Sequence, residues 1–167
     1  MNKNSARYAK DGDTLILQLS GDVRHPLAPA IDALLNNTFA DSRLTRYLID
    51  LNQAETIDST CLGILAGIAN HLAQRGEGKP VIVSSNPDIT ELLRVVCFDQ
   101  QFHILSGDSI ETAELEALET LAVDEREMLE LVLSAHRRLC AIDERNQTVF
   151  QDLVTALEAE QRQGKDG

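Results

Sequence analysis

Strand-like and helix-like segments alternate along most of the chain, and this alternation limits the fold more than any other feature. Residues 14–23 alternate apolar and mixed positions, whereas later segments repeat apolar residues every three or four positions, as helices do. The expected strands are residues 14–23, 46–51, 80–86 and 102–106, and the expected helices are residues 25–41, 60–74 and 87–98. Residues 5–11 are an expected edge strand before the Asp11-Gly12 turn. Such alternation predicts an α/β fold with a mixed, mostly parallel sheet of four or five strands and right-handed crossovers.

The character of the sequence changes after Gly107, where no further strand is expected. Residues 108–130 carry nine acidic residues and one basic residue, Arg126, while apolar residues keep a helical spacing. A terminal helix is expected near residues 112–121. Further helices follow, with a break or a continuous helix at residues 141–143. We therefore divide the chain into a domain at residues 1–122 and a helical extension at residues 123–167. The apolar stripe of the extension could cover the domain by folding back on it, form a homodimer interface, or bind a second regulator.

Composition excludes several classes of function. The formal net charge is −12, so a clustered basic face for nucleic acid is not expected, and an anionic membrane surface is disfavoured. No signal peptide or bilayer-spanning run is present in these 167 residues, which predicts a cytoplasmic protein. The three cysteines, Cys61, Cys97 and Cys140, are widely spaced among apolar residues and are expected to be free thiols.

No catalytic constellation is visible in the sequence. The four histidines are His25, His71, His103 and His136, and none has a metal-ligand spacing to another. Each is expected to be a surface or hydrogen-bonded structural residue. Phosphate-binding glycine loops and the nucleophile elbow of hydrolases are also missing. The sequence thus predicts a protein that is not an enzyme and that needs no metal or cofactor.

The segment "IDSTCLGIL", residues 57–65, stands where a strand hands over to a helix. Asp58 or Ser59 can cap the helix that begins near Thr60, since their side-chain oxygens accept hydrogen bonds from free amides in its first turn. A cap explains these residue types without any further role. The surrounding pattern, however, adds a second interpretation.

That pattern resembles the STAS domain, the fold of bacterial anti-sigma factor antagonists. The matching features are a strand ending in Asp-Leu at residues 50–51, then Asp58-Ser59-Thr60, Leu62-Gly63, a helix, a glycine-bearing turn and an apolar strand. A helix started by Pro87 and a last strand with Phe102 complete the likeness, which covers residues 5–106. The resemblance implies a STAS-like fold, and the helical C-terminal extension goes beyond the usual domain of this family.

The resemblance also implies a phosphorylation switch. Ser59 matches the hydroxyl that a partner kinase phosphorylates in this family, and Thr60 is the second choice. The kinase is a histidine-kinase-like ATPase that also acts as an anti-sigma factor, and a PP2C-type, metal-dependent phosphatase reverses the modification. A serine at a helix N-terminus is expected to be exposed to that kinase. The expected partner-binding residues are Gly21, Asp22, Asp58, Thr60, Cys61, Leu62 and Gly63.

Two positions depart from the family pattern, and two other functions compete with the switch. Arg24 stands where many members carry an acidic residue, and Cys61 replaces the usual Gly or Ala. One competing function is a STAS subunit that docks on an ABC transporter ATPase in lipid trafficking, where the hydroxyl is only a contact. The other is a small hydrolase or transferase, which the missing nucleophile–base pair disfavours.

Overall fold

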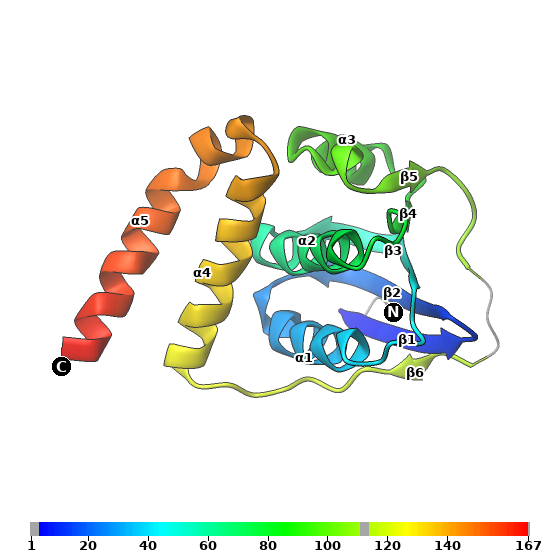
Figure 1. Cartoon of the computed structure of the whole chain (residues 1–167), viewed down its shortest axis with the longest axis horizontal. Helices are drawn as coiled ribbons and strands as arrows, with labels where there is room; N and C mark the ends of the chain where they lie inside the picture. Colours follow the sequence, from blue (N-terminus) through cyan, green and yellow to red (C-terminus); the bar gives the residue numbers. More distant parts are fainter. Residues whose placement is uncertain (1–3, 111–113, 167) are drawn as a thin grey trace.

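Six strands form one mixed sheet with the order β5-β4-β3-β2-β1-β6 (Figure 1). The structure is a computed structural model that describes residues 4–110 and 114–166. The strands are β1 (Ser5–Asp11), β2 (Thr14–Val23), β3 (Arg46–Ile57), β4 (Val81–Val83), β5 (His103–Leu105) and β6 (Glu116–Ala117). The α/β class and the mostly parallel sheet expected from the alternation are therefore confirmed.

Strands β2, β3, β4 and β5 run parallel, joined by helices α1 (Ala28–Phe39), α2 (Ser59–Gln74) and α3 (Pro87–Val95). Short 3₁₀ turns, His25–Leu27 and Phe98–Gln100, flank α1 and α3. Alternate β2 side chains, Leu15, Leu17 and Leu19, are almost fully buried and form the core with apolar residues of the helices. Strand β3 extends six residues beyond the expected 46–51 because β2 pairs with it as far as Ile57.

The segment after β5 covers part of the sheet face that points away from the core. The Asp50 side chain on that face is fully buried and accepts hydrogen bonds from the backbone amides of Ile110 (3.0 Å) and Asn52 (2.9 Å). Gln18 donates a third bond to the same carboxylate at 3.3 Å. A buried carboxylate needs hydrogen-bond donors, so these bonds to Asp50 hold the segment after β5 against this face of the sheet.

The helix expected near residues 112–121 is wrong for the part that the structure describes. Residues 114–124 contain no helix, and β6 pairs antiparallel with β1 through Arg7↔Ala117 and Tyr8↔Glu116. Residues 112 and 113 lie outside the described residues. The free edge of β1 offers unpaired backbone groups, and pairing with β6 satisfies some of them. The sheet therefore has one strand more than the expected maximum, and β1 is not its edge.

The extension forms two helices, α4 (Glu125–Ile142) and α5 (Glu144–Asp166), that fold back on each other (Figure 1). Asp124 caps α4 by accepting a hydrogen bond from the Glu127 amide at 2.8 Å. Asp143, with φ −161° and ψ 151°, is extended and separates the helices, which settles the alternative left open at residues 141–143. In Figure 1, α4 lies beside α2, and α5 lies outside α4.

Candidate functional site

The site is built at the N-terminus of α2, where β2 and β3 end side by side. The Asp58 amide donates to the Val23 carbonyl at 2.9 Å, which ties the start of α2 to the end of β2. One carboxylate oxygen of Asp58 accepts from the Cys61 amide at 2.9 Å, and the other accepts from the His25 amide at 2.7 Å. Asp58 is thus the helix cap, as one of the two expected candidates, and it also holds the loop that leads into α1.

Replacing Asp58 by alanine should lower the stability of the protein. The change leaves the Cys61 and His25 amides without their acceptor, which costs about 1–2 kcal/mol by the usual effect of losing a helix N-cap. Urea unfolding followed by circular dichroism checks the loss, with Asp152→Ala, an exposed position on α5, as the control. Equal midpoints for the two variants would show that the cap contributes nothing.

Ser59 is the first residue of α2, and its hydroxyl meets a histidine from the extension. The distance from Ser59 Oγ to His136 Nε2 is 2.8 Å, and the His136 side chain is only 2% exposed. His136 Nδ1 lies 2.7 Å from the Val132 carbonyl oxygen, which can only accept, so Nδ1 carries a proton. In the neutral imidazole, Nε2 is therefore the acceptor, and the Ser59 hydroxyl donates to it.

Thr60, Cys61 and Leu62 face the interior. Thr60 is 6% exposed and the other two are 1% exposed, whereas Ser59 is half-buried. The second-choice hydroxyl is therefore less accessible than the first. Burial, with help from the nearby Asp58 charge, raises the pKa of the Cys61 thiol well above its usual value.

Because Cys61 is buried and its thiol pKa is raised, it should react slowly with thiol reagents in the folded protein. We expect no modification of Cys61 by iodoacetamide at pH 8 over a period in which the urea-unfolded chain is fully modified. Peptide mass spectrometry reads each cysteine separately, with half-buried Cys140 as the internal comparison. Rapid alkylation of Cys61 in the native protein would contradict this burial.

Gly63 lets the backbone of α4 come very close to α2. A Cβ atom at Gly63 would overlap the Ala135 carbonyl oxygen and lie 2.5 Å from its carbon, a position that no side chain tolerates. A Cβ atom at Gly67, one turn further, would lie 3.6 Å from the Arg138 guanidinium, which is an ordinary contact distance. Ser59, Gly63 and Gly67 are four residues apart, so they share one face of α2, and α4 covers that face.

Gly21 and Asp22 lie at the end of β2, near a bulge in β3. Gly21 has φ +74°, a conformation that favours glycine, and a Cβ there would lie 2.6 Å from Asn4 Oδ1. The Asp22 amide donates to the same Asn4 oxygen at 2.9 Å, and its carboxylate accepts from the Thr56 hydroxyl at 2.9 Å. Both residues lie on the end of the sheet from which α2 starts.

Two features of the site differ from the sequence-based expectations. Ser59 is not freely exposed, because α4 lies over it, and His136 is buried against the candidate site. The histidines are expected to be either exposed or hydrogen-bonded, and His136 is hydrogen-bonded. Its partner, however, is the hydroxyl of Ser59, the expected phosphoacceptor. A signal was available in the glycine spacing of α2, which marks a face suited to close helix packing, although it does not name the partner helix.

The described part of the chain shows no cluster of acidic, histidine or cysteine side chains that could hold a metal ion. None of the helices in residues 4–110 and 114–166 is long and apolar enough to cross a membrane. The candidate site comprises a capped helix start, a half-buried hydroxyl and a covering helix.

The geometry can be compared with known proteins. The family model of the STAS domain matches residues 5–113, which is more than half of the chain. The chain belongs to the STAS-domain family. Its STAS domain carries Ser59 at the start of α2, whereas residues 114–167, with α4 and α5, lie outside the matched segment. No curated protein sequence matches the chain.

Solved structures with the same fold include anti-sigma factor antagonists. The Bacillus cell fate determinant SpoIIAA in its phosphorylated form is 12% identical, with a TM-score of 0.53 over 62% of this chain and 92% of that one. An anti-sigma factor antagonist from Mycobacterium paratuberculosis is 21% identical, with a TM-score of 0.54 over 62% and 86%. A putative one from Thermotoga maritima is 22% identical, with a TM-score of 0.53 over 60% and 85%. At these identities the likeness concerns the STAS fold.

Proposed function

We propose that this STAS-domain protein is an anti-sigma factor antagonist switched by phosphorylation of Ser59. It binds a partner anti-sigma factor, which is also its serine kinase of the histidine-kinase-like ATPase type, when Ser59 is unphosphorylated. A PP2C-type phosphatase restores the binding form. The observation that carries this proposal is the position of Ser59 as the first residue of α2, directly after the capping residue Asp58, in a domain of this family.

The choice of Ser59 over Thr60 is supported by burial. Thr60 is 6% exposed within the first turn of α2, whereas Ser59 is half-buried and its hydroxyl points away from the sheet core toward α4. Once the surface is free, Ser59 is therefore the hydroxyl that a kinase can approach. Backbone amides at a helix N-terminus also suit a phosphate group, which favours modification there.

A phosphate on Ser59 would weaken partner binding through charge. It adds roughly −1.5 to −2 charges at pH 7, beside Asp58 and inside the proposed contact surface. The proposed surface comprises Gly21, Asp22, Asp58, Thr60, Cys61, Leu62 and Gly63. The buried members of this set pack beneath the exposed ones and hold them in place. A loss of about 1–3 kcal/mol of binding free energy lowers the affinity by roughly tenfold to hundredfold. The STAS domain needs no change of fold.

The protein itself is proposed to be no enzyme, because the phosphoryl transfer belongs to the partner kinase, which brings ATP and magnesium. Ser59 and His136 lie at the distance of a nucleophile and its base. However, the second imidazole nitrogen faces a backbone carbonyl of its own helix rather than an orienting carboxylate, and α4 lies over the hydroxyl. The pair is thus better explained as a contact between α2 and α4. With ATP and a kinase as partners, we place the protein in the cytoplasm, without nucleic acid or membrane as ligands.

The extension, proposed to begin after residue 122, is the part of the chain proposed to form a homodimer. The apolar face of α4 packs on the STAS domain, so a homodimer through these helices would have to use the outer face of α5. Val149, 67% exposed, and Leu153, 42% exposed, are the large apolar side chains available there.

A subunit that docks on an ABC transporter ATPase remains the competing function, because the same surface could bind an ATPase without accepting phosphate. The deciding experiment is incubation of the full chain with candidate histidine-kinase-like serine kinases and ATP, followed by intact mass and Phos-tag gels. The proposal predicts the addition of one phosphate, located on Ser59 by peptide fragmentation. No phosphate on Ser59 or Thr60 with any cognate kinase would favour the docking subunit.

A further inference from the structure

Helix α4 covers the same face of α2 that the proposed function needs. Three residues of that face, Ser59, Gly63 and Gly67, each meet α4, through His136, Ala135 and Arg138 respectively. Ala135 and His136 are at most 2% exposed, so both α4 residues are buried against α2. The covering also explains why every residue of α2 from Thr60 to Ala66 is buried, although only one side of this helix can face the sheet.

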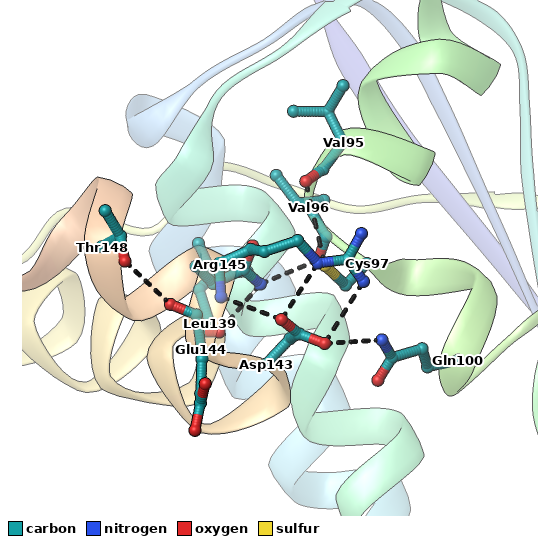
Figure 2. Close-up of polar contacts among 10 residues, drawn as sticks. Val95, Val96, Cys97, Gln100, Leu139, Asp143, Glu144, Arg145 and Thr148 are labelled. Atoms are coloured by element: carbon teal, nitrogen blue, oxygen red, sulfur yellow. Dashed lines mark hydrogen bonds and ion pairs between the residues drawn. The ribbon is translucent and has the colours of Figure 1, made fainter.

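The hairpin of α4 and α5 is held in place by a second set of contacts at its tip. Asn146, 1% exposed, donates from its side-chain amide to the carbonyl oxygens of Val96 (2.8 Å) and Leu139 (2.9 Å). Gln100 donates to the Asp143 carboxylate at 2.8 Å, as Figure 2 shows. Arg145 also pairs with Asp143 at 3.0 Å and lowers its pKa, which keeps that carboxylate charged as an acceptor (Figure 2).

The hairpin is joined to the STAS domain by an exposed, extended segment. Residues 119–122 are exposed and lie between β6, which is fixed to β1, and the start of α4. Such a segment can act as a tether, because α4 and α5 can leave the face of α2 without disturbing the strands of the sheet.

We propose that the α4–α5 hairpin is an internal competitor for the partner-binding surface, which docks over Ser59 and must undock before a kinase or partner can bind. This regulation rests on the proposed function of Ser59. In the docked state the hydroxyl is hydrogen-bonded to a buried imidazole 2.8 Å away, so the ring occupies space beside Ser59 Oγ that a phosphoryl group would need. The affinity measured for a partner is then its intrinsic affinity reduced by the fraction of undocked molecules.

A phosphate on Ser59 would, by the same geometry, keep the hairpin undocked. Its three oxygen atoms would occupy the space of the His136 ring, which contacts Ser59 in the docked state. Phosphorylation would therefore act twice: it would repel the partner and hold α4 away from α2.

The test needs no kinase, because it measures whether position 59 is covered. In full-length Ser59→Cys protein, the rate of maleimide labelling at residue 59 reports how often the hairpin undocks, with peptide fragmentation separating residue 59 from Cys61. The variant Gly63→Ala is added because its methyl group cannot coexist with the Ala135 carbonyl oxygen, whereas alanine suits helix α2 itself. Gly67→Ala is the matched control, since a Cβ there makes only an ordinary contact with Arg138.

We expect Gly63→Ala to raise the labelling rate at residue 59 by about tenfold or more and Gly67→Ala to leave it within about twofold. Amide hydrogen exchange should accelerate along α4 in the first variant, while β2 and β3 stay protected. A second pair of variants checks that the result does not depend on how Gly63→Ala folds. Ala135→Glu places a charge between α2 and α4, and its control, Ala141→Glu, places the same charge on an exposed position of α4.

Equal labelling in all variants, or labelling of the Ser59→Cys protein as fast as that of the urea-unfolded chain, would overturn the proposal. The proposed phosphorylation could still hold in that case, because the labelling does not depend on it. Conversely, fast labelling in Gly63→Ala without any phosphorylation of Ser59 would retain the covering hairpin and reject the switch.

Discussion

Replacing Ser59 by alanine is expected to abolish phosphorylation while the protein still binds its partner. The variant lacks the hydroxyl oxygen that would form the bond to phosphorus, so the effect is all or none. It also leaves His136 Nε2 buried without its donor, at a cost of about 1–3 kcal/mol to the docked hairpin. Partner binding should therefore be equal to or tighter than that of the unphosphorylated parent protein. Intact mass after kinase treatment and titration calorimetry measure the two effects.

The matched control is Thr60→Ala, which removes the neighbouring hydroxyl from a residue that is 6% exposed. It should still accept one phosphate. Loss of phosphorylation in Thr60→Ala, together with its retention in Ser59→Ala, would transfer the acceptor to Thr60. A phosphate retained by both variants would move the acceptor out of this site altogether.

Replacing Asn146 by alanine is expected to loosen the hairpin strongly. Its side-chain amide is the donor that links the start of α5 to the Val96 and Leu139 carbonyls, and both bonds are buried. Leaving these two acceptors unpaired costs about 2–4 kcal/mol, because water does not reach them while the hairpin is docked. Much of that cost falls on docking, so hydrogen exchange in α4 and α5 should accelerate by roughly tenfold to hundredfold.

Gln147→Ala is the comparison for Asn146→Ala, since Gln147 is the exposed neighbour on the same helix. It should exchange at the parent rate. We also expect Asn146→Ala to be phosphorylated faster than the parent protein at equal kinase concentration. A variant with a loosened hairpin but an unchanged phosphorylation rate would show that docking does not limit access to Ser59.

The sequence is sufficient to predict the STAS domain because its patterns are local. Alternating Leu15, Leu17 and Leu19 define a strand, and the cap Asp58 marks the start of a helix. These signals depend on neighbouring residues, so they survive without knowledge of the tertiary structure. Strand β6 carries no comparable signal. Its two residues, Glu116 and Ala117, become a strand only because the edge of β1 is there to pair with them.

The contact between Ser59 and His136 could not be predicted for a different reason. The two residues are 77 positions apart, and the helical spacing of α4 identifies its apolar face without saying what that face covers. Gly63 offered a partial signal, since glycine inside a helix is unfavourable unless a close approach requires it. Its meaning becomes clear only when the Ala135 backbone lies against it.

A phosphate on Ser59 is proposed to decide whether the protein binds its anti-sigma factor. Titration calorimetry of the full chain with the cognate kinase domain, before and after quantitative phosphorylation, measures this change in affinity. A non-hydrolysable ATP analogue in the calorimeter cell prevents further phosphoryl transfer during the titration. We predict that the affinity falls by roughly tenfold to hundredfold on phosphorylation. Equal affinities for the two forms, with the phosphate located on Ser59, would contradict it.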